Sequence, residues 1–129
     1  MIYYLEIDEV LFIHEIMISL YGGRGDIHDF TMLHSAIERP KATFGGKDLY
    51  PTIFEKAAAL IQSLILNHPF DDGNKRTAVT STARFFYING YQLKLPLKKS
   101  IQFTLDIDSH KLSFEEIVSW FKKHAKRLK

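Results

Sequence analysis

The residues best able to do chemistry lie together in positions 68–77, which read His-Pro-Phe-Asp-Asp-Gly-Asn-Lys-Arg-Thr. This stretch ends a nearly apolar segment with an imidazole and an acidic turn, and then begins a helix-like segment with Lys75 and Arg76. The start of a helix is the positive end of its dipole, so cations are disfavoured there. Two cations at that point indicate a bound anion, and a phosphate fits best.

His68 is the candidate catalytic base. It closes a predicted helix in line with Ile61 and Leu64, which would place its ring at the inner edge of the core. The unperturbed pKa of a histidine is about 6.5, so an imidazole can accept a proton from an incoming hydroxyl near neutral pH. The alternative is a histidine that only caps the last carbonyls of a helix. The acidic glycine turn that follows favours the catalytic interpretation.

Asp72 is the candidate metal ligand. Mg²⁺ in nucleotide sites is typically held by one or two carboxylates and the phosphates themselves. Asp71, next to it, is interpreted as a surface turn residue. An ordinary Asp-rich turn would explain either aspartate, but it would not explain the cations that follow.

The residues after the aspartates are predicted to form an anion hole. Gly73 and Asn74 suit positive φ angles, which let the N–H groups of Asn74, Lys75 and Arg76 converge. Side chains lean toward the start of a helix, so Arg76 would offer a planar fork to a phosphate and Lys75 a point charge. The alternative is Asn74 as a helix cap beside two exposed cations. Phe70 is expected to anchor the loop in the core.

The elements that must position these residues are predicted to be mostly helical. Periodicity indicates helices over 8–20, 31–38, 52–68, 74–89 and 97–106, and a last one after Ser113. The run 57–66 is apolar nearly all round, so the third helix should be central and buried. Residues 2–5 are expected to form a short edge strand. Residues 41–50 are expected to form a mobile connecting loop or flap, which is either a plain connection or part of a target-docking surface.

Particular residues mark the helix ends. Gly22 should stop the first helix, Asp29 should cap the second, and Pro40 should end it. Pro51 fits the first turn of the third helix. In the fourth helix, Val79, Ala83 and Phe86 should share one face, and Gly90 should follow the last helical residue. Ser113 and Glu116 should form a capping box at the start of the last helix.

Bulk properties limit the class of protein. The 129 residues predict a single domain (1–129), with 46% apolar and 25% charged residues and no cysteine. The longest apolar run is too short to span a bilayer, and no signal-peptide pattern opens the chain, so we expect a cytoplasmic protein without membrane contact. A net charge of +2 does not favour direct nucleic-acid binding. The basic end is interpreted as a solvated last helical turn, with Lys122, Lys123, Lys126, Arg127 and Lys129.

The motif resembles that of the Fic/Doc family, His-x-Phe-x-Asp/Glu-x-Asn-Gly/Lys-Arg. Every position is filled, by His68, Phe70, Asp72, Asn74, Lys75 and Arg76. Lys75 is typical of the death-on-curing (Doc) toxin branch, whereas the Fic branch has Gly there and often a second Arg where this chain has Val79. The likeness extends to Gly22-Gly23, 35–40, 49–51, 55–58 and Asn89-Gly90.

The resemblance implies a compact all-α Fic/Doc-type bundle and a kinase-like enzyme. A Doc-like protein would use Mg²⁺ and ATP, with His68 as base, and would transfer the γ-phosphate to a threonine of elongation factor Tu, which stops translation. Many Fic proteins carry an inhibitory helix with Glu followed by Gly or Asn. No Glu in this chain is so followed, so restraint is expected from a separate Phd-like antitoxin.

Three other functions are weighed against this one. Fic-type AMP transfer to a protein hydroxyl is the nearest, and Lys75 and Val79 speak against it. A metal phosphohydrolase of the HD type is suggested by His28-Asp29 and by histidines at 14, 34 and 68, but no second ligand pair follows at helical spacing. A catalytically silent binding module would have no need to keep cations at a helix start.

Overall fold

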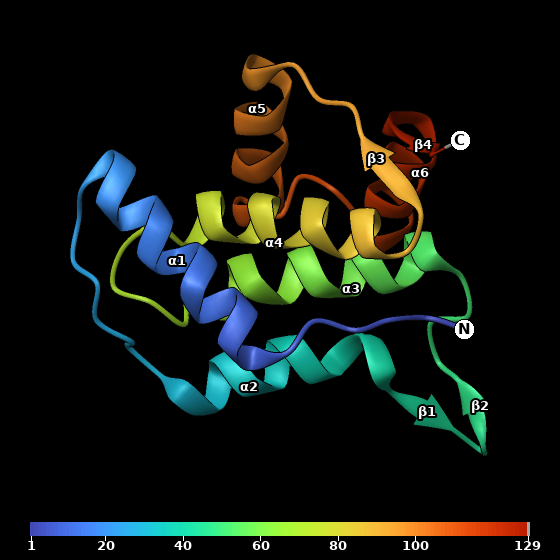
Figure 1. Cartoon of the computed structure of the whole chain (residues 1–129). Helices are drawn as coiled ribbons and strands as arrows, with labels where there is room; N and C mark the ends of the chain where they lie inside the picture. Colours follow the sequence, from blue (N-terminus) through green and yellow to red (C-terminus); the bar gives the residue numbers. More distant parts are fainter. Residues whose placement is uncertain (129) are drawn as a thin grey trace.

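Helices dominate the computed structural model, which describes residues 1–128 (Figure 1). The elements are α1 (Ile7–Tyr21), α2 (Phe30–Glu38), the 3-10 turn η1 (Arg39–Lys41), α3 (Ile53–Leu66), α4 (Asn74–Ile88), α5 (Leu97–Asp108) and α6 (Phe114–His124). The prediction of a compact, mostly helical bundle is confirmed. The described part also holds two small antiparallel sheets that were not predicted.

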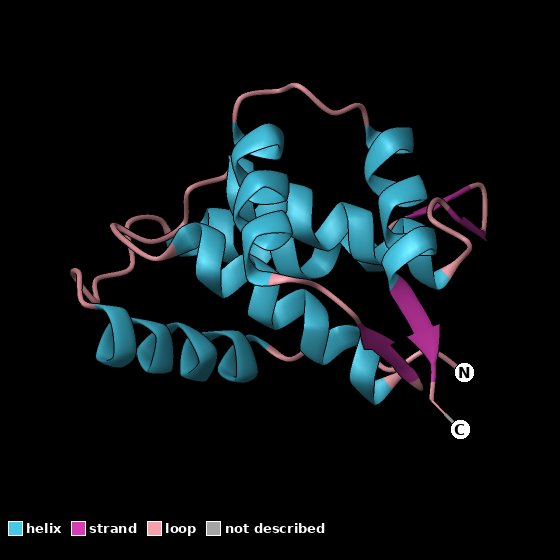
Figure 2. Ribbon diagram, turned by 90° about the horizontal axis from the view of Figure 1, so that it is seen from above, coloured by secondary structure: helices cyan, strands magenta, loops and turns pink. Residues whose placement is uncertain are grey.

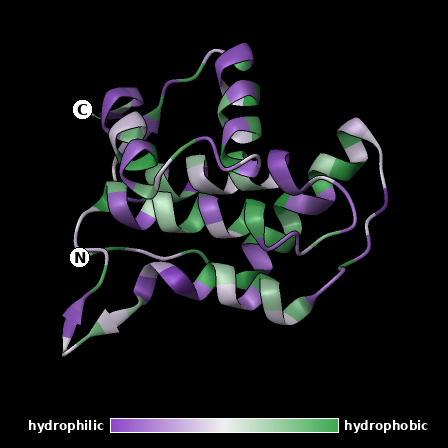
Figure 3. Cartoon of the chain, turned by 180° about the vertical axis from the view of Figure 1, so that it is seen from behind, coloured by the Kyte–Doolittle hydropathy of each residue, from purple (hydrophilic) through white to green (hydrophobic). Residues whose placement is uncertain are grey.

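α3 is the central helix, as its composition predicted. It packs against α2, α4, α5 and α6, and α4 runs back alongside it (Figures 1 and 2). Residues 57–61 of α3 are all buried, because an alanine-rich helix lets its neighbours approach from every side. Figure 3 shows hydrophobic residues concentrated in the helices and hydrophilic ones in the loop between α1 and α2. The α3–α4 pair therefore forms the frame on which the motif loop, 67–73, is held.

Several predicted helix ends are confirmed. The Asp29 side chain accepts the Met32 N–H at 3.1 Å and caps α2. Ser113 and Glu116 form the expected capping box of α6, and Gly90 follows α4 with φ 86°. Two predictions at α3 are wrong: Pro51 precedes the cap residue Thr52 instead of lying in the first turn, and the helix ends at Leu66.

The two sheets correct two further expectations. Residues 41–50 form a hairpin, β1 (Thr43–Phe44) with β2 (Lys47–Asp48), and not an irregular loop. β3 (Tyr91–Leu93) pairs with β4 (Ala125–Arg127), so Lys126 and Arg127 lie in a strand and not in the last helical turn. Lys129 lies outside the described residues. The hairpin precedes the N-terminus of α3, whereas the motif loop follows the C-terminus of the same helix (Figure 1). The hairpin and the motif loop are therefore separated by the length of α3.

The expected edge strand over residues 2–5 is absent from the structure. The segment is extended, but the Asn89 side chain takes the place of a neighbouring strand: its Oδ1 accepts the Tyr3 N–H and its Nδ2 donates to the Tyr3 carbonyl, both at 2.8 Å. One side chain therefore satisfies the backbone that a ladder would have satisfied.

The face predicted for α4 is only partly right. Phe86 is buried, but Val79 and Ala83 are only partly buried. The buried residues are Thr77, Ala78, Ser81, Thr82, Phe85 and Phe86. Small hydroxyl residues replace large apolar ones where α4 packs between α1 and α3, and Thr82 returns its hydroxyl to the Ala78 carbonyl at 2.7 Å. This polar stripe does not carry the apolar signal on which the prediction relied.

Candidate functional site

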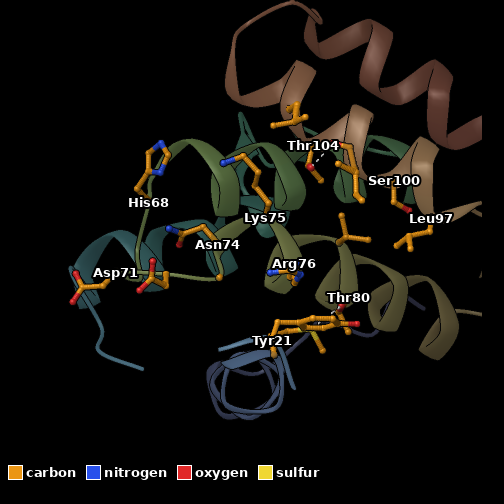
Figure 4. A pocket seen from close by; sticks show the side chains of 16 residues that line it. Tyr21, His68, Asp71, Asn74, Lys75, Arg76, Thr80, Leu97, Ser100 and Thr104 are labelled. Carbon is orange, nitrogen blue, oxygen red and sulfur yellow. Dashed lines mark hydrogen bonds between the residues drawn. The ribbon is translucent and has the colours of Figure 1, made fainter. Parts of the chain in front are cut away.

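The predicted site residues meet at a cavity of about 670 Å³ between the end of α1, the start of α4 and α5 (Figure 4). Its lining residues are Met17, Tyr21, His68, Asp71–Arg76, Val79, Thr80, Leu97, Ser100, Ile101, Thr104 and Leu105. Six of the seven residues singled out from the sequence are among them. The seventh, Phe70, is the expected anchor and is buried.

His68 reaches this cavity because it has left the helix. Its φ of +46° is the left-handed conformation that commonly follows the end of a helix. The side chain is 54% exposed, so the expected position at the inner edge of the core is wrong. The backbone turn carries the ring out of line with Ile61 and Leu64 and toward the cavity. Left-handed backbone at a non-glycine residue is strained, and such strain is concentrated at functional sites.

Phe70 holds the motif loop through a histidine of α1. The Phe70 ring is 2% exposed and stacks face to face on His14, with centroids 3.6 Å apart. The buried His14 then donates from Nε2 to the backbone carbonyl of Asp72 at 2.8 Å, since a carbonyl can only accept. The anchoring role of Phe70 is confirmed. The role of His14 was missed, because in the sequence it is only one apolar-face residue of a helix.

The Asn74 side chain has a role that the sequence did not predict. Its Oδ1 accepts the Phe70 N–H at 3.0 Å and its Nδ2 donates to the Phe70 carbonyl at 2.9 Å. The side chain therefore braces the loop and leaves only its backbone N–H for an anion. Gly73, and not Asn74, precedes the helix, with φ 79°. A Cβ on Gly73 would lie 3.3 Å from Ile18 Cδ1, so close packing as well as conformation favours glycine.

The start of α4 is open, as predicted. Gly73 has no side chain to accept from the first turn, and the first backbone bond of the helix runs from the Thr77 N–H to the Gly73 carbonyl at 3.0 Å. The three N–H groups of Asn74, Lys75 and Arg76 precede that bond and have no carbonyl of the helix to bind. They are therefore suited to an anion in the cavity.

The two cations line the cavity on opposite sides. Lys75 Nζ lies 3.0 Å from Asp108 Oδ2 on α5, and the Arg76 guanidinium lies over the Tyr21 ring of α1, 4.2 Å from its centroid. Figure 4 shows Lys75 directed toward α5 and Arg76 toward α1. The two cations do not converge on one point, although both are at the rim of the open helix start.

Asp72 is held by the loop that follows α1. Its Oδ2 accepts the Arg24 N–H at 2.7 Å, and a Cβ on Gly23 would lie 2.9 Å from the Asp72 Cβ. A single positioned carboxylate at a phosphate site fits the way Mg²⁺ is held with a nucleotide. Asp71, which is 3.7 Å from Arg24 and 3.4 Å from His28 Nδ1, is a turn residue in a charged surface cluster, as predicted.

No protein-only metal centre accompanies this site in residues 1–128. No three His, Cys, Asp or Glu side chains come together there in a way that could hold a metal ion. His28 contacts Asp71 and Asp29 caps α2. The HD-type interpretation of the histidines therefore has no support in the described structure.

Asp108, the last residue of α5, is the second residue that the sequence did not reveal. Its Oδ1 lies 3.3 Å from His68 Nε2, and its Oδ2 contacts Lys75. The hydrogen bond from Lys75, with the positive charges around it, holds the pKa of the Asp108 carboxyl below its usual value. The packing of α5 against α3 and α4 brings this residue to the motif, so no local pattern marks it.

Comparison with known proteins agrees with this geometry. The sequence pattern of the Fic/DOC family matches residues 4–86. The chain is similar to a protein named Toxin Doc from Mycolicibacterium smegmatis, 46% identical over 90 residues, which are 70% of this chain and 67% of the relative. It is also similar to Protein kinase doc of Escherichia phage P1, 31% identical over 86 residues, 67% of this chain and 68% of the relative. Among the described residues, no helix combines the length and the apolar character needed to cross a membrane. The chain belongs to the Fic/DOC family.

Proposed function

We propose that this protein is a Doc-like phosphotransferase that moves the γ-phosphate of ATP to a hydroxyl side chain of a target protein. The observation that carries the proposal is the position of His68 and of the open α4 start on the same cavity. One supplies a proton acceptor and the other a site for the phosphates. The names of the relatives, a toxin and a protein kinase, support the same activity.

The residues divide the transfer between them. The N–H groups of Asn74–Arg76 and the guanidinium of Arg76 bind and orient the phosphates. His68 accepts the proton of the incoming hydroxyl as its oxygen bonds to the γ-phosphorus. The bond from that phosphorus to the bridging oxygen breaks, and ADP leaves. Positioning and charge neutralisation account for most of the acceleration in such a transfer.

Asp72 is the residue proposed to hold Mg²⁺. Its carboxylate is fixed by Arg24 at the mouth of the cavity, beside the expected phosphate positions. When bound, the ion would neutralise charge on the phosphate oxygens. We therefore expect Mg²⁺–ATP to raise the Tm of the wild type and to have a much smaller effect on the Tm of Asp72→Asn.

The family and the names of the relatives support a proposal for the biological setting. We propose that the protein is the toxin of a toxin–antitoxin pair, that a threonine of elongation factor Tu is the acceptor, and that a Phd-like antitoxin restrains it in the cytoplasm. The exposed side chains Leu97, Ile101 and Leu105 form an apolar stripe on α5 along the cavity. An amphipathic antitoxin segment would cover such a stripe and block the cavity.

The test is intact-mass analysis of elongation factor Tu after incubation with the protein and Mg²⁺–ATP. His34→Asn, at an exposed histidine of α2 outside the cavity lining, is the control. His68→Asn is the active-site variant, and the backbone at residue 68 is left-handed, with φ 46°. Asn tolerates that conformation. Addition of one phosphate by the wild type and the control, and none by His68→Asn, is expected.

Other masses would overturn the proposal. Addition of AMP would assign the chain to the transferase chemistry of the Fic branch. No addition to elongation factor Tu or to any protein of a cell extract supplied with labelled ATP would indicate a silent binding module.

A further inference from the structure

We propose that Asp108 is a positioning residue for the reaction: it orients the His68 ring and stabilises the positive charge that the ring gains when it accepts a proton. The inference rests on the proposed phosphotransferase function. It adds to the motif a group from α5, outside the residues that the family pattern matches, which end at residue 86.

The contact with Asp108 favours one tautomer of the ring. Asp108 Oδ1 is 3.3 Å from His68 Nε2, at ion-pair distance. An ionised carboxylate can only accept, so it favours the tautomer with hydrogen on Nε2, and Nδ1 then keeps the lone pair that can act as the base. His68 is half exposed and stands on a strained turn, so a fixed partner restricts a ring that would otherwise rotate.

The surroundings keep Asp108 ionised. Lys75 lies 3.0 Å from the other carboxylate oxygen, and His110 adds a further favourable charge when protonated. Lys75 on α4, His68 in the motif loop and His110 in the turn after α5 together hold the pKa of the Asp108 carboxyl low. The carboxylate is thus negative whenever His68 is able to act as a base.

The role in the transfer is electrostatic and needs no further reactant. The acceptor hydroxyl gives its proton to His68 Nδ1, the oxygen–phosphorus bond forms, and ADP departs with the bridging oxygen. The imidazolium that results lies against the Asp108 carboxylate, as the imidazolium of a catalytic triad lies against its aspartate. Asp108 touches neither substrate and keeps no proton.

Kinetics of Asp108→Asn provide the first test, with Asp106→Asn as the control. Asp106 is on the same helix, but its carboxylate accepts from Gln102 at 2.8 Å and does not contact the motif. We expect Asp108→Asn to lower kcat by about 10- to 100-fold with little change in the KM for Mg²⁺–ATP. Asp108→Glu should recover part of the loss. A wild-type or higher kcat in Asp108→Asn would overturn the inference and would identify Asp108 as a bystander or as a barrier to the phosphate.

Nitrogen NMR of the His68 ring provides a test that does not depend on activity. The wild type and Asp106→Asn should show one fixed tautomer with hydrogen on Nε2, and Asp108→Ala should show a mixture. An unchanged tautomer in Asp108→Ala would overturn the inference. If the wild-type protein transfers nothing to any target, the proposed function fails, and the tautomer still decides whether Asp108 orients the ring.

Discussion

The two central helices begin in opposite ways. At the start of α3, the Thr52 hydroxyl accepts the Glu55 N–H at 3.2 Å, and the Glu55 carboxylate adds a negative charge to the first turn. At the start of α4, Gly73 offers no side chain, and the first turn carries Lys75 and Arg76. Both helices lie in the core and pack against each other, so burial of the helix bodies does not explain the difference between their starts.

The comparison separates folding from function. The N-terminus of α3 is capped by its own side chains, and such a cap typically stabilises a helix by about 1 kcal/mol. The N-terminus of α4 lacks a side-chain cap, and each cation there is unfavourable by roughly 0.3–1 kcal/mol at an exposed site. The sequence therefore tolerates a less stable helix start only at the one of these two ends that faces the cavity.

The largest effect is expected from Arg76→Ala, which removes a cation from the open start. Phosphate transfer should fall about 100-fold or more, because a charged fork on the transferring group is lost. The free energy of unfolding should change by less than about 0.5 kcal/mol, because the relief of an unfavourable cation at the helix start offsets the lost contact with the Tyr21 ring. Transfer rates and chemical denaturation measure the two quantities. Arg84→Ala, on the same helix but paired with Glu9, is the control, and equal transfer by both variants would contradict the assignment.

Gly73→Ala tests whether packing against α1, as well as backbone conformation, requires glycine at the start of α4. A left-handed alanine costs roughly 1–2 kcal/mol, and its Cβ would lie 3.3 Å from Ile18 Cδ1. Gly45→Ala in the hairpin has the same conformational demand, with φ 60°, but nothing within 4 Å. Denaturant unfolding should show a larger loss for Gly73→Ala. Equal losses would mean that α1 does not restrict this position.

Thr52→Ala tests the closed start. Loss of the cap should lower the free energy of unfolding by about 1 kcal/mol, measured by chemical denaturation, while transfer by the folded protein stays unchanged. Thr52→Ser keeps the hydroxyl and should remain close to the wild type. A fall in transfer with Thr52→Ala would show that the two helix ends are not separable as we propose.

The smallest effect is expected in the pH dependence of the free energy of unfolding. It comes from the ion pair between Asp108 and Lys75, the second cation of the open α4 start. The pKa of Asp108 is lower in the folded protein than its usual 3.8. The contribution of the ionised carboxylate to the stability of the fold is therefore complete above pH 3.8 and is lost as the pH falls through the folded pKa. Unfolding curves of the wild type and Asp108→Asn should therefore differ at pH 7 and converge in acid. The pair is partly exposed, so the difference should be small. A difference that persists below the folded pKa would contradict the ion pair as its source.

Local patterns were sufficient for most of the helices and for the motif. The apolar run 57–66 predicted the buried α3, and Asp29 and Ser113 predicted their caps, because these signals act within one turn of a helix. The cations after Gly73 predicted an open helix start for the same reason. Polar residues in the core, such as Thr77 and Ser81, gave no such signal, so the face predicted for α4 was only partly right.

What the sequence by itself determined is therefore the set of helices and the residue types gathered in one loop. Only the tertiary structure decided how those residues are used. It turned His68 out of α3 by a left-handed residue, directed the Asn74 amide back to Phe70, and brought Asp108 from α5 to His68. These outcomes depend on contacts between segments distant in the chain, and helix periodicity and capping carry no information about such contacts.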